Sequence, residues 1–524
     1  MTKWENRAAR LAGEQGTIVK DWGGRLAVAL VYPNTYHVGM SSLGLHALYR
    51  LFNQYDDVVC ERAFWDNAHA PLALESQRPL TDFSALACTV SYELDYLNLV
   101  ALLRAAGIPP LAEQRDERHP IVIAGGPAPT ANPVPLSLVC DAVAVGDGEV
   151  LVPPILDALR AGDRTQQLAA LAAVPGIYTL HAPRTTRRQW APDLDAFPVS
   201  TVIHTADTEF GDMTLVEVAR GCGRGCRFCL TGYCLRPPRE RSLDVLLQQA
   251  EEGLRHRARI GLVGAAVSDY SRIDELATGI RALGGRIAVS SLRADSLTEP
   301  LLAALAESGV QTLTLAPEAG SQRLRDVIRK GLTEEQILRA AEQAQAHRFR
   351  RLKLYFMVGL PGETDADVAA IVDLCQAVRA RFRGTITAKL TPFVPKAGTP
   401  FQWVAMASAF TLRTRQRRLR RDLRQLGIGV RLDNAEWAAV QGVLSRGDED
   451  VGRALALCKA PHRGAWRGAL YVYDVDPACY LGAWPLDEPF PWDVVAPLSP
   501  PYQGGSNADR DLLRREYQRA IELT

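Results

Sequence analysis

The chain has 524 residues, a length that suits about two to four domains. Lys and Arg number 60 against 59 Asp and Glu, which gives a formal net charge of +1, so no global field attracts nucleic acid. Hydrophobic residues make up 47% and charged residues 23% of the chain, which is typical of a soluble globular enzyme.

The N-terminus and the cysteines indicate the compartment. Residues 1–15 carry charges throughout and lack the apolar segment of a secretory signal. No run approaches the roughly 18 apolar residues of a membrane span. The ten cysteines are scattered apart from one loop, unlike a disulfide framework. We therefore expect a cytoplasmic protein without a membrane span.

The first part of the chain alternates short apolar runs with helical patterns such as Leu43–Phe52 and Tyr96–Ala106. The apolar runs predict buried strands, at Arg25–Tyr32, Ala85–Val90, Ile121–Ala124 and Ala142–Val145. Strands that alternate with helices predict a parallel, doubly wound α/β sheet. We expect this Rossmann-like domain over residues 1–175.

Small residues follow the predicted strands of this domain. They are Ser91, Gly125, Gly126, Gly146 and Gly148. Sheets of this kind bind ligands at the carboxyl ends of their strands, and glycines there allow the backbone to approach a large flat ligand closely. Tight turns alone are the alternative explanation for the glycines.

A second strand–helix alternation follows an irregular segment, residues 176–212, that we interpret as a linker. It predicts strands at Thr214–Val218, Ile260–Gly264, Ile287–Ser290, Thr312–Ala316, Lys353–Val358 and Thr385–Leu390. This number of units in about 180 residues predicts a partial (β/α)6 TIM-like barrel with its active site at the carboxyl-terminal mouth. We place this barrel at residues 213–430.

The loop after the first strand of the barrel holds the most specific motif. Cys222, Cys226 and Cys229 stand at the spacing C-x3-C-x2-C, which suits three corners of a [4Fe-4S] cube. One iron would then have no protein ligand, and an open metal position is where a reactant can bind. The alternatives are a zinc knuckle without its fourth ligand, or three unrelated thiols. Cys234 could be a fourth ligand, but we interpret it as a nearby free thiol.

This loop resembles the cluster loop of the radical S-adenosylmethionine (SAM) enzymes, in which C-x3-C-x-aromatic-C follows the first strand of a partial barrel. Phe228 stands at the aromatic position. The resemblance implies that SAM chelates the open iron and that the reduced cluster cleaves SAM to a 5′-deoxyadenosyl radical. It also implies an electron donor such as flavodoxin or ferredoxin.

The resemblance further implies SAM-binding residues in the loops after the next strands. Gly264 and Ser268 follow the second strand, where many family members carry G-G-E. This chain lacks that glutamate, so Ser268, Asp269 or backbone carbonyls would replace it. Arg293 follows the third strand and could pair with the SAM carboxylate. Glu318 follows the fourth and could accept hydrogen bonds from the ribose or the SAM amine. A surface ion pair for Arg293 and a helix N-terminal carboxylate for Glu318 are the alternatives.

The loop after the fifth strand resembles the family's adenine-binding element. Val358 and Gly359 would meet the adenine there, again as an implication of the resemblance. The same loop contains Glu363, which we expect to cap the following helix.

The N-terminal region resembles the cobalamin-binding domain of cobalamin-dependent radical SAM proteins, and most of the chain resembles one largely uncharacterised subgroup of them. Family members that ligate cobalt use D-x-H-x-x-G after the first strand. Here Thr35, His37 and Gly39 do not reproduce that motif. We therefore expect cobalamin, if bound, to lie near Ser91 and the four glycines named above without a histidine ligand. Loss of cobalamin binding is the alternative.

Beyond the barrel, Leu412–Leu426 predicts a basic helix with one leucine stripe and seven arginines. A solvated face is our preferred interpretation of the arginines, and an RNA or phosphate contact is the alternative. Residues 431–524 predict a small, mainly helical C-terminal domain.

Taken together, the sequence predicts a radical SAM enzyme that uses a [4Fe-4S] cluster, SAM and cobalamin to methylate an unactivated carbon. The substrate would be a small molecule or RNA. Radical rearrangement, cyclisation or methylthiolation form the first alternative, and a non-catalytic cobalamin or redox sensor forms the second.

Overall fold

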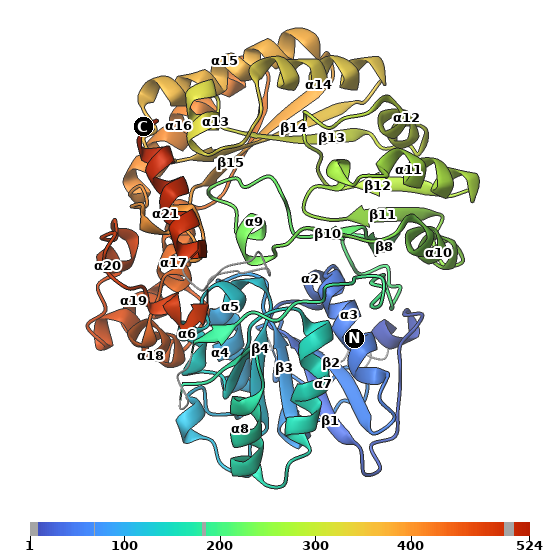
Figure 1. Cartoon of the computed structure of the whole chain (residues 1–524), viewed down its shortest axis with the longest axis vertical. Helices are drawn as coiled ribbons and strands as arrows, with labels where there is room; N and C mark the ends of the chain where they lie inside the picture. The colour runs from blue at the N-terminus through green and yellow to red at the C-terminus, as the bar shows by residue number, and fades with distance from the viewer. Residues whose placement is uncertain (1–8, 68, 181–184, 497–507) are drawn as a thin grey trace. The chain divides into compact units, whose positions relative to one another are not determined.

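The computed structural model describes residues 9–67, 69–180, 185–496 and 508–524. The chain separates into two units (Figure 1). The main strands of unit 1 form one sheet, and those of unit 2 form two. Unit 1 comprises residues 1–212, 443–480 and 489–499, and unit 2 comprises residues 213–442, 481–488 and 500–524.

Unit 1 is built on a sheet with the strand order β2-β1-β3-β4-β5-β6. Its strands are β1 (Leu26–Tyr32), β2 (Val58–Phe64), β3 (Ala85–Thr89), β4 (Ile121–Gly125), β5 (Ala142–Ala144) and β6 (Ile177–Tyr178). All neighbours are parallel except β5 and β6. The doubly wound α/β prediction is therefore confirmed. The sequence did not predict β2 or β6, and β6 lies in the segment expected to be a linker.

Helices cover both faces of this sheet. They are α2 (Tyr36–Met40), α3 (Leu43–Asn53), α4 (Asp95–Ala105), α5 (Pro127–Ala131), α6 (Val134–Ser137), α7 (Gly148–Leu159) and α8 (Arg164–Ala173), with short 3-10 turns at Leu80–Asp82 and Ala112–Gln114. Val28 and Leu30 of β1 pack in one cluster with residues of α3 and α7. Ala27 and Ala29, which point to the other face, are buried as well. Burial on both sides explains why these strands read as continuous apolar runs.

The C-terminal region does not form a domain of its own, which corrects the expectation for residues 431–524. Its elements are α17 (Ala435–Ser445), α18 (Glu449–Leu457), α19 (Arg463–Val472), α20 (Pro477–Leu481), η5 (Pro491–Val494), β17 (Val495–Ala496) and α21 (Ala508–Ile521). Within unit 1, α18 packs on α4 and α6, and the Asn132 side chain donates to the Gly447 carbonyl at 2.8 Å. In the same unit β17 pairs with β7 (Thr186–Arg187). The region is divided because the apolar faces of its helices are buried against two different cores.

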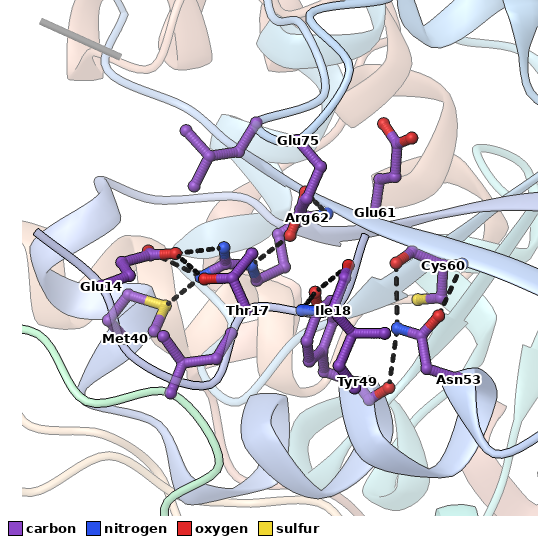
Figure 2. A network of polar contacts seen from close by, with 12 residues as sticks. Glu14, Thr17, Ile18, Met40, Tyr49, Asn53, Cys60, Glu61, Arg62 and Glu75 are labelled. Carbon is purple, nitrogen blue, oxygen red and sulfur yellow. Dashed lines mark hydrogen bonds and ion pairs between the residues drawn. The ribbon is translucent and has the colours of Figure 1, made fainter. Parts of the chain in front are cut away.

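A buried ionic network fixes the N-terminal segment of unit 1 to the edge strand β2 (Figure 2). The Arg62 guanidinium donates to Glu14 and to Glu75, each at 2.7 Å, and all three side chains are essentially inaccessible to solvent. Burial opposes ionisation of Glu14, but the hydrogen bonds and charge of Arg62 lower its pKa overall. Burial raises the pKa of Glu75. The Glu61-Arg62 pair interrupts the apolar run of β2, which explains why the sequence pattern did not reveal this strand.

Unit 2 is a partial barrel of parallel strands. They are β8 (Thr214–Glu217), β11 (Arg259–Val263), β12 (Arg286–Val289), β13 (Thr312–Glu318), β14 (Arg351–Val358), β15 (Thr385–Pro392) and β16 (Gly429–Leu432). They form two sheets, β12-β11-β8 and β13-β14-β15-β16, which a bridge between Leu292 and Leu315 connects. The predicted barrel is confirmed, with β16 as an additional strand. A short antiparallel pair, β9 (Ala219–Arg220) and β10 (Arg239–Glu240), flanks it.

The long helices of unit 2 lie outside the strands (Figure 1). They are α10 (Leu243–Leu254), α11 (Ile273–Ala282), α12 (Glu299–Glu307), α14 (Glu334–Ala346), α15 (Asp365–Arg381) and α16 (Ala409–Gln425). The loops between strands also form the shorter helices α9 (Thr231–Cys234) and α13 (Gln322–Val327) and the 3-10 turns η3 (Val267–Asp269) and η4 (Pro400–Trp403). One large apolar core fills the space between the strands and these helices. Alternate strand residues belong to that core, so the others face the inside of the barrel.

Candidate functional site

The cysteine motif lies on the loop that follows β8 and β9, at the carboxyl-terminal mouth of the barrel. Two glycines shape the loop: Gly221 has φ +82° and Gly225 has φ +71°. A Cβ on Gly221 would lie 2.2 Å from the carbonyl oxygen of Leu235, so only glycine fits there. The loop therefore turns tightly immediately before Cys222 and again before Cys226.

Two arginines hold this loop in place. Arg224 donates to both carboxylate oxygens of Asp269, each at 2.7 Å, and to Asp295 at 3.2 Å. Arg227 pairs with Glu516 of α21 at 3.1 Å and donates to the Val327 carbonyl at 2.7 Å. The loop is thus tied to the ends of β11, β12 and α13 as well as to the C-terminal helix.

Cys222, Cys226 and Cys229 lie together on this loop. In the described part of the chain, no group of three or more His, Cys, Asp or Glu side chains could hold one metal ion. A [4Fe-4S] cube bound by three cysteines places each of them on a different iron. Burial raises the pKa of Cys226 and of Cys229. Cys229 interacts electrostatically with Cys222, and Cys226 with Cys229.

Cys234, which the sequence analysis interprets as a thiol outside the cluster, is buried on α9. Its Sγ lies 3.6 Å from where a Cβ on Gly398 would be.

The predicted SAM residues after β11 and β12 are brought together. Ser268, on η3, accepts from the backbone N–H of Arg293 at 3.2 Å and from the Ser296 hydroxyl at 2.8 Å. The Arg293 guanidinium donates to Asp295 at 3.0 and 3.1 Å. Its side chain is only 10% exposed, so this is not the surface ion pair that the sequence left open. Gly264 follows β11, and a Cβ on it would lie 3.2 Å from the Val218 side chain.

Lys330 links the two charged residues that the sequence selected. Its Nζ lies 3.1 Å from a carboxylate oxygen of Glu318, and its carbonyl accepts from Arg293 at 3.0 Å. Lys330 is buried, and its charge lowers the pKa of Cys226 against the effect of burial. Sequence reasoning missed this residue because it lies beyond α13, far along the chain from β13. Glu318 itself has φ +68°, an unusual backbone conformation that is often found at functional sites.

Phe228, on the cysteine loop, packs against a group of apolar side chains at the mouth of the barrel. Phe228, Met357 and Tyr517 pack against one buried cluster, whose members are Ala319, Leu324, Val327, Ile328, Leu360, Phe393, Phe401, Val404 and Ala520. The structure therefore connects the aromatic position of the motif to the end of β14 and to α21.

The loop after β14 corrects the expectation for Glu363. The N-cap of α15 is Thr364, whose side chain accepts from the Asp367 N–H. Glu363 instead accepts from the N–H of Gly359 at 2.7 Å and from Arg415 at 2.6 Å. Burial raises its pKa to about 7. Glu363 thus fixes the turn at Gly359, which directly follows Val358, the buried last residue of β14.

The predicted cobalamin residues lie at the carboxyl ends of adjacent strands of unit 1. At two of these positions only glycine fits against the neighbouring backbone. A Cβ on Gly126 would lie 2.3 Å from the Val90 carbonyl oxygen, and one on Gly146 would lie 2.0 Å from the Gln189 carbonyl oxygen. A Cβ on Gly148, at the start of α7, would meet the Leu48 side chain at 2.6 Å. These three positions therefore reflect tight packing and are not by themselves evidence for a ligand.

Gly125 and Ser91 are less constrained. A Cβ on Gly125 would make only ordinary contacts with Ala144. Ser91 is exposed, and its hydroxyl hydrogen-bonds the Tyr32 phenol. His37 is also exposed; its Nδ1 lies 3.2 Å from Asp207 and its Nε2 lies 3.7 Å from Glu209.

Comparisons with known proteins define the family. The model for "Radical SAM proteins, N-terminal" matches residues 44–179, and that for the "Radical SAM superfamily" matches residues 216–375. The chain is also 31% identical over 443 residues to the uncharacterized protein MJ0966 of Methanocaldococcus jannaschii, which covers 83% of this chain and 91% of that protein. The chain therefore belongs to the radical SAM superfamily.

More distant similarities extend to characterised proteins. Over 183 residues the chain is 29% identical to a tRNA-2-methylthio-N(6)-dimethylallyladenosine synthase of Alteromonas mediterranea, but this covers 32% of the chain and 38% of that enzyme. The fold resembles the radical SAM methyltransferase TsrM of Kitasatospora setae (TM-score 0.50, 15% identity, 73% of this chain and 78% of that one). It also resembles the cobalamin-dependent radical SAM enzyme OxsB (TM-score 0.51, 13% identity, 83% and 66%).

None of the helices in the described residues combines the length and the apolar character needed to cross a membrane.

Proposed function

We propose that this radical SAM protein is a cobalamin-dependent methyltransferase that acts on an unactivated carbon. One observation carries the proposal: the cysteine loop lies beside a buried set of opposite charges, Arg293, Lys330 and Glu318, at the mouth of the barrel. Membership of the superfamily supports the radical chemistry. The likeness of fold to TsrM and OxsB, which are named as a methyltransferase and a cobalamin-dependent enzyme, supports the finer assignment.

The cysteine loop would hold the cluster through Cys222, Cys226 and Cys229. When bound and reduced, a [4Fe-4S] cluster with SAM on its open iron supplies a radical capable of attacking an unactivated C–H bond. The chain's contribution is to fix the loop through Arg224 and Arg227, so that the thiols need little rearrangement on binding iron.

The charges around Lys330 match the methionine end of SAM. Arg293 and Lys330 are cations suited to its carboxylate. Because Nε and Nη2 of Arg293 donate to Asp295 and to the Lys330 carbonyl, Arg293 would meet SAM through its Nη1. Glu318 can accept from the ammonium group or from ribose hydroxyls. Val358 and Gly359, in the turn that Glu363 holds, would offer backbone groups to the adenine. Phe228 and the apolar cluster beside it would exclude water from the reacting centre.

Cobalamin is proposed at the carboxyl ends of β1, β3, β4 and β5 in unit 1. At this edge of the sheet a ligand could contact Ser91, which is exposed, and Gly125, where an added Cβ would make only ordinary van der Waals contacts. His37 pairs with Asp207 and Glu209, which agrees with a site that has no histidine ligand. When bound, cobalamin would carry the methyl group.

The test uses full-length protein reconstituted anaerobically with iron, sulfide and cobalamin. We expect about four irons and one cobalamin per chain, and reductive cleavage of SAM to 5′-deoxyadenosine with dithionite. Changing the three cysteines to Ala should abolish the iron chromophore and the cleavage, whereas Cys234→Ala should not. Equal loss of iron in Cys234→Ala would refute the ligand assignment. A loaded protein that never cleaves SAM would be a sensor and not an enzyme.

Methylthiolation of RNA is the second candidate, because of the similarity to the tRNA methylthio synthase. On α16, Arg413 and Arg415 pair with Glu436 and Glu363, so part of the basic helix is structural. Arg417, Arg420 and Arg424 are exposed on its outer side. An enzyme that modifies RNA should bind RNA through them with a strong salt dependence, which a small-molecule methyltransferase would lack.

A further inference from the structure

A row of polar side chains crosses the inner face of the barrel on three neighbouring strands. Leu354 of β14, Ala388 of β15 and Val430 of β16 all pack on the outer core, so the residues that follow them point inward. These are Tyr355, Lys389 and Arg431, which are paired in register across β14, β15 and β16.

Two cations stand side by side in this row. Neighbouring strands lie about 4.8 Å apart, and like charges directly opposite each other destabilise a sheet. Lys389 is 40% exposed, lies 5.9 Å from the Tyr355 ring centroid and is 3.3 Å from Asp433. The exposed side chain of Arg431 makes no hydrogen bond or ion pair with any other described residue. Among the described residues, Asp433 is the one carboxylate that pairs with these two cations, so it offsets their mutual repulsion only in part.

A third cation lies one step further down the same face. Lys353 precedes Tyr355 by two residues on β14 and is in register with Thr387, so it also points inward. Its side chain, too, has no hydrogen-bonding or ionic partner among the residues that the structure describes. The inner face of β14–β16 therefore presents three cations to one carboxylate, and an anion placed there would relieve their mutual repulsion.

The row lies close to the proposed radical site. Met357, two residues beyond Tyr355 on β14, packs against the same apolar cluster as Phe228 of the cysteine loop. Two residues along a strand span about 7 Å. A ligand whose anionic group met Lys389 and Arg431 could thus extend from this row to the mouth of the barrel, where the reacting carbon must be.

We propose that Lys353, Lys389 and Arg431 form the binding site for an anionic group, a carboxylate or a phosphate, on the substrate of this enzyme. The proposal rests on the proposed function, because it assigns the substrate to the barrel that would hold SAM. Tyr355 lies opposite Lys389 on β14, and Thr391 lies two residues beyond Lys389 on β15. Both would contact the uncharged part of the substrate next to the anion.

The test is calorimetric titration of the full-length protein with pyrophosphate and, separately, with citrate at constant ionic strength. We expect one of the two to bind, which also tells a phosphate site from a carboxylate site. Lys389→Gln and Arg431→Gln should each weaken binding about tenfold, the effect of losing a charge-assisted hydrogen bond. Arg383→Gln is the matched control, since Arg383 is exposed before β15, at the opposite end of the barrel from its mouth.

Stability without an anion gives a second readout. Removing one of two adjacent like charges should leave the melting temperature of Arg431→Gln unchanged or raised. The proposal is overturned if neither anion binds, if Arg383→Gln weakens binding as much as Arg431→Gln, or if the Arg431 and Lys389 variants both unfold at lower temperature. None of these measurements uses SAM or iron, so absence of SAM cleavage would count against the proposed function without affecting this result.

Discussion

At the scale of single residues, Lys330 gives the sharpest test of the SAM site. Its side chain is buried between Glu318 and the cysteine loop, so Lys330→Met removes a charge without leaving a gap. We expect SAM to bind about tenfold more weakly, as for other hydrogen bonds to charged groups, while iron content stays the same. Equilibrium binding of SAM to the reconstituted protein measures this. The control is Lys459→Met, which changes an exposed lysine in unit 1; equal SAM affinity in both variants would contradict the assignment.

His46 predicts an acid-sensitive unit 1. It is buried, its Nε2 lies 3.1 Å from the Met40 carbonyl, and its Nδ1 accepts from the N–H groups of Val202 and Ile203 at 3.3 Å. Burial lowers its pKa from 6.5 to about 4, so the folded state prefers the neutral ring. Its contribution to stability is complete above the unfolded pKa and is lost as the pH falls towards 4.

The expected size of this effect follows from linkage. Between pH 7.5 and 5 the free energy of unfolding should fall by about 2 kcal/mol because of His46 alone. Urea unfolding of unit 1 at the two pH values, for the wild type and for His46→Gln, measures it. The variant should lose about 2 kcal/mol less than the wild type. Equal losses would show that the ring accepts a proton without cost.

At the scale of elements, α21 is the part of the site that no sequence pattern revealed. Glu516 is buried and lies 3.1 Å from Arg227 and 2.9 Å from Arg329. Burial opposes its ionisation, but Arg329 and Arg227 lower its pKa overall. Glu516→Gln should therefore leave Arg227 without its counter-charge and cost about 3 kcal/mol of stability in unit 2.

The same variant should also release iron faster, because Arg227 lies between two cluster cysteines. Removing residues just outside a metal site typically weakens metal binding about 10–100-fold. Thermal unfolding and the rate of iron loss to a chelator are the two measurements. Glu522→Gln, an exposed change at the end of the same helix, is the control. If Glu516→Gln and Glu522→Gln unfold at the same temperature and lose iron at the same rate, α21 does not support the cysteine loop.

Features that leave a pattern in neighbouring residues could be predicted from the sequence, whereas features that depend on distant contacts could not. The strands that read as continuous apolar runs were predicted with small errors at their ends, because burial on both faces leaves a local pattern. β2 was missed because Glu61 and Arg62 interrupt its apolar run and are paired only by distant residues. Lys330 and Glu516 were missed for a related reason: their roles come from contacts that only the folded chain creates. The C-terminal region was misjudged because composition cannot tell which core a helix packs against.

At the scale of the whole molecule, each unit carries one candidate cofactor site, so iron and cobalamin binding should be separable. The triple change of Cys222, Cys226 and Cys229 to Ala alters only a loop of unit 2 and should leave cobalamin affinity intact. Ser91→Trp places a bulky ring at an exposed position on the carboxyl edge of the unit 1 sheet, where it should block cobalamin and leave iron intact. Gly126→Trp would not serve, because its side chain would strike the chain's own Val90 carbonyl.

The control for the cobalamin site is Arg118→Trp, an equally bulky change at an exposed residue just before β4, at the amino edge of the same sheet. Cobalamin titration followed by absorption, together with iron analysis, measures both cofactors in all three variants. We expect Ser91→Trp to lose cobalamin, Arg118→Trp to keep it, and both to retain about four irons. If Ser91→Trp binds cobalamin as tightly as the wild type, the site does not lie at this edge. If the wild type itself binds none, unit 1 is a scaffold and the chemistry is that of a radical SAM enzyme without cobalamin.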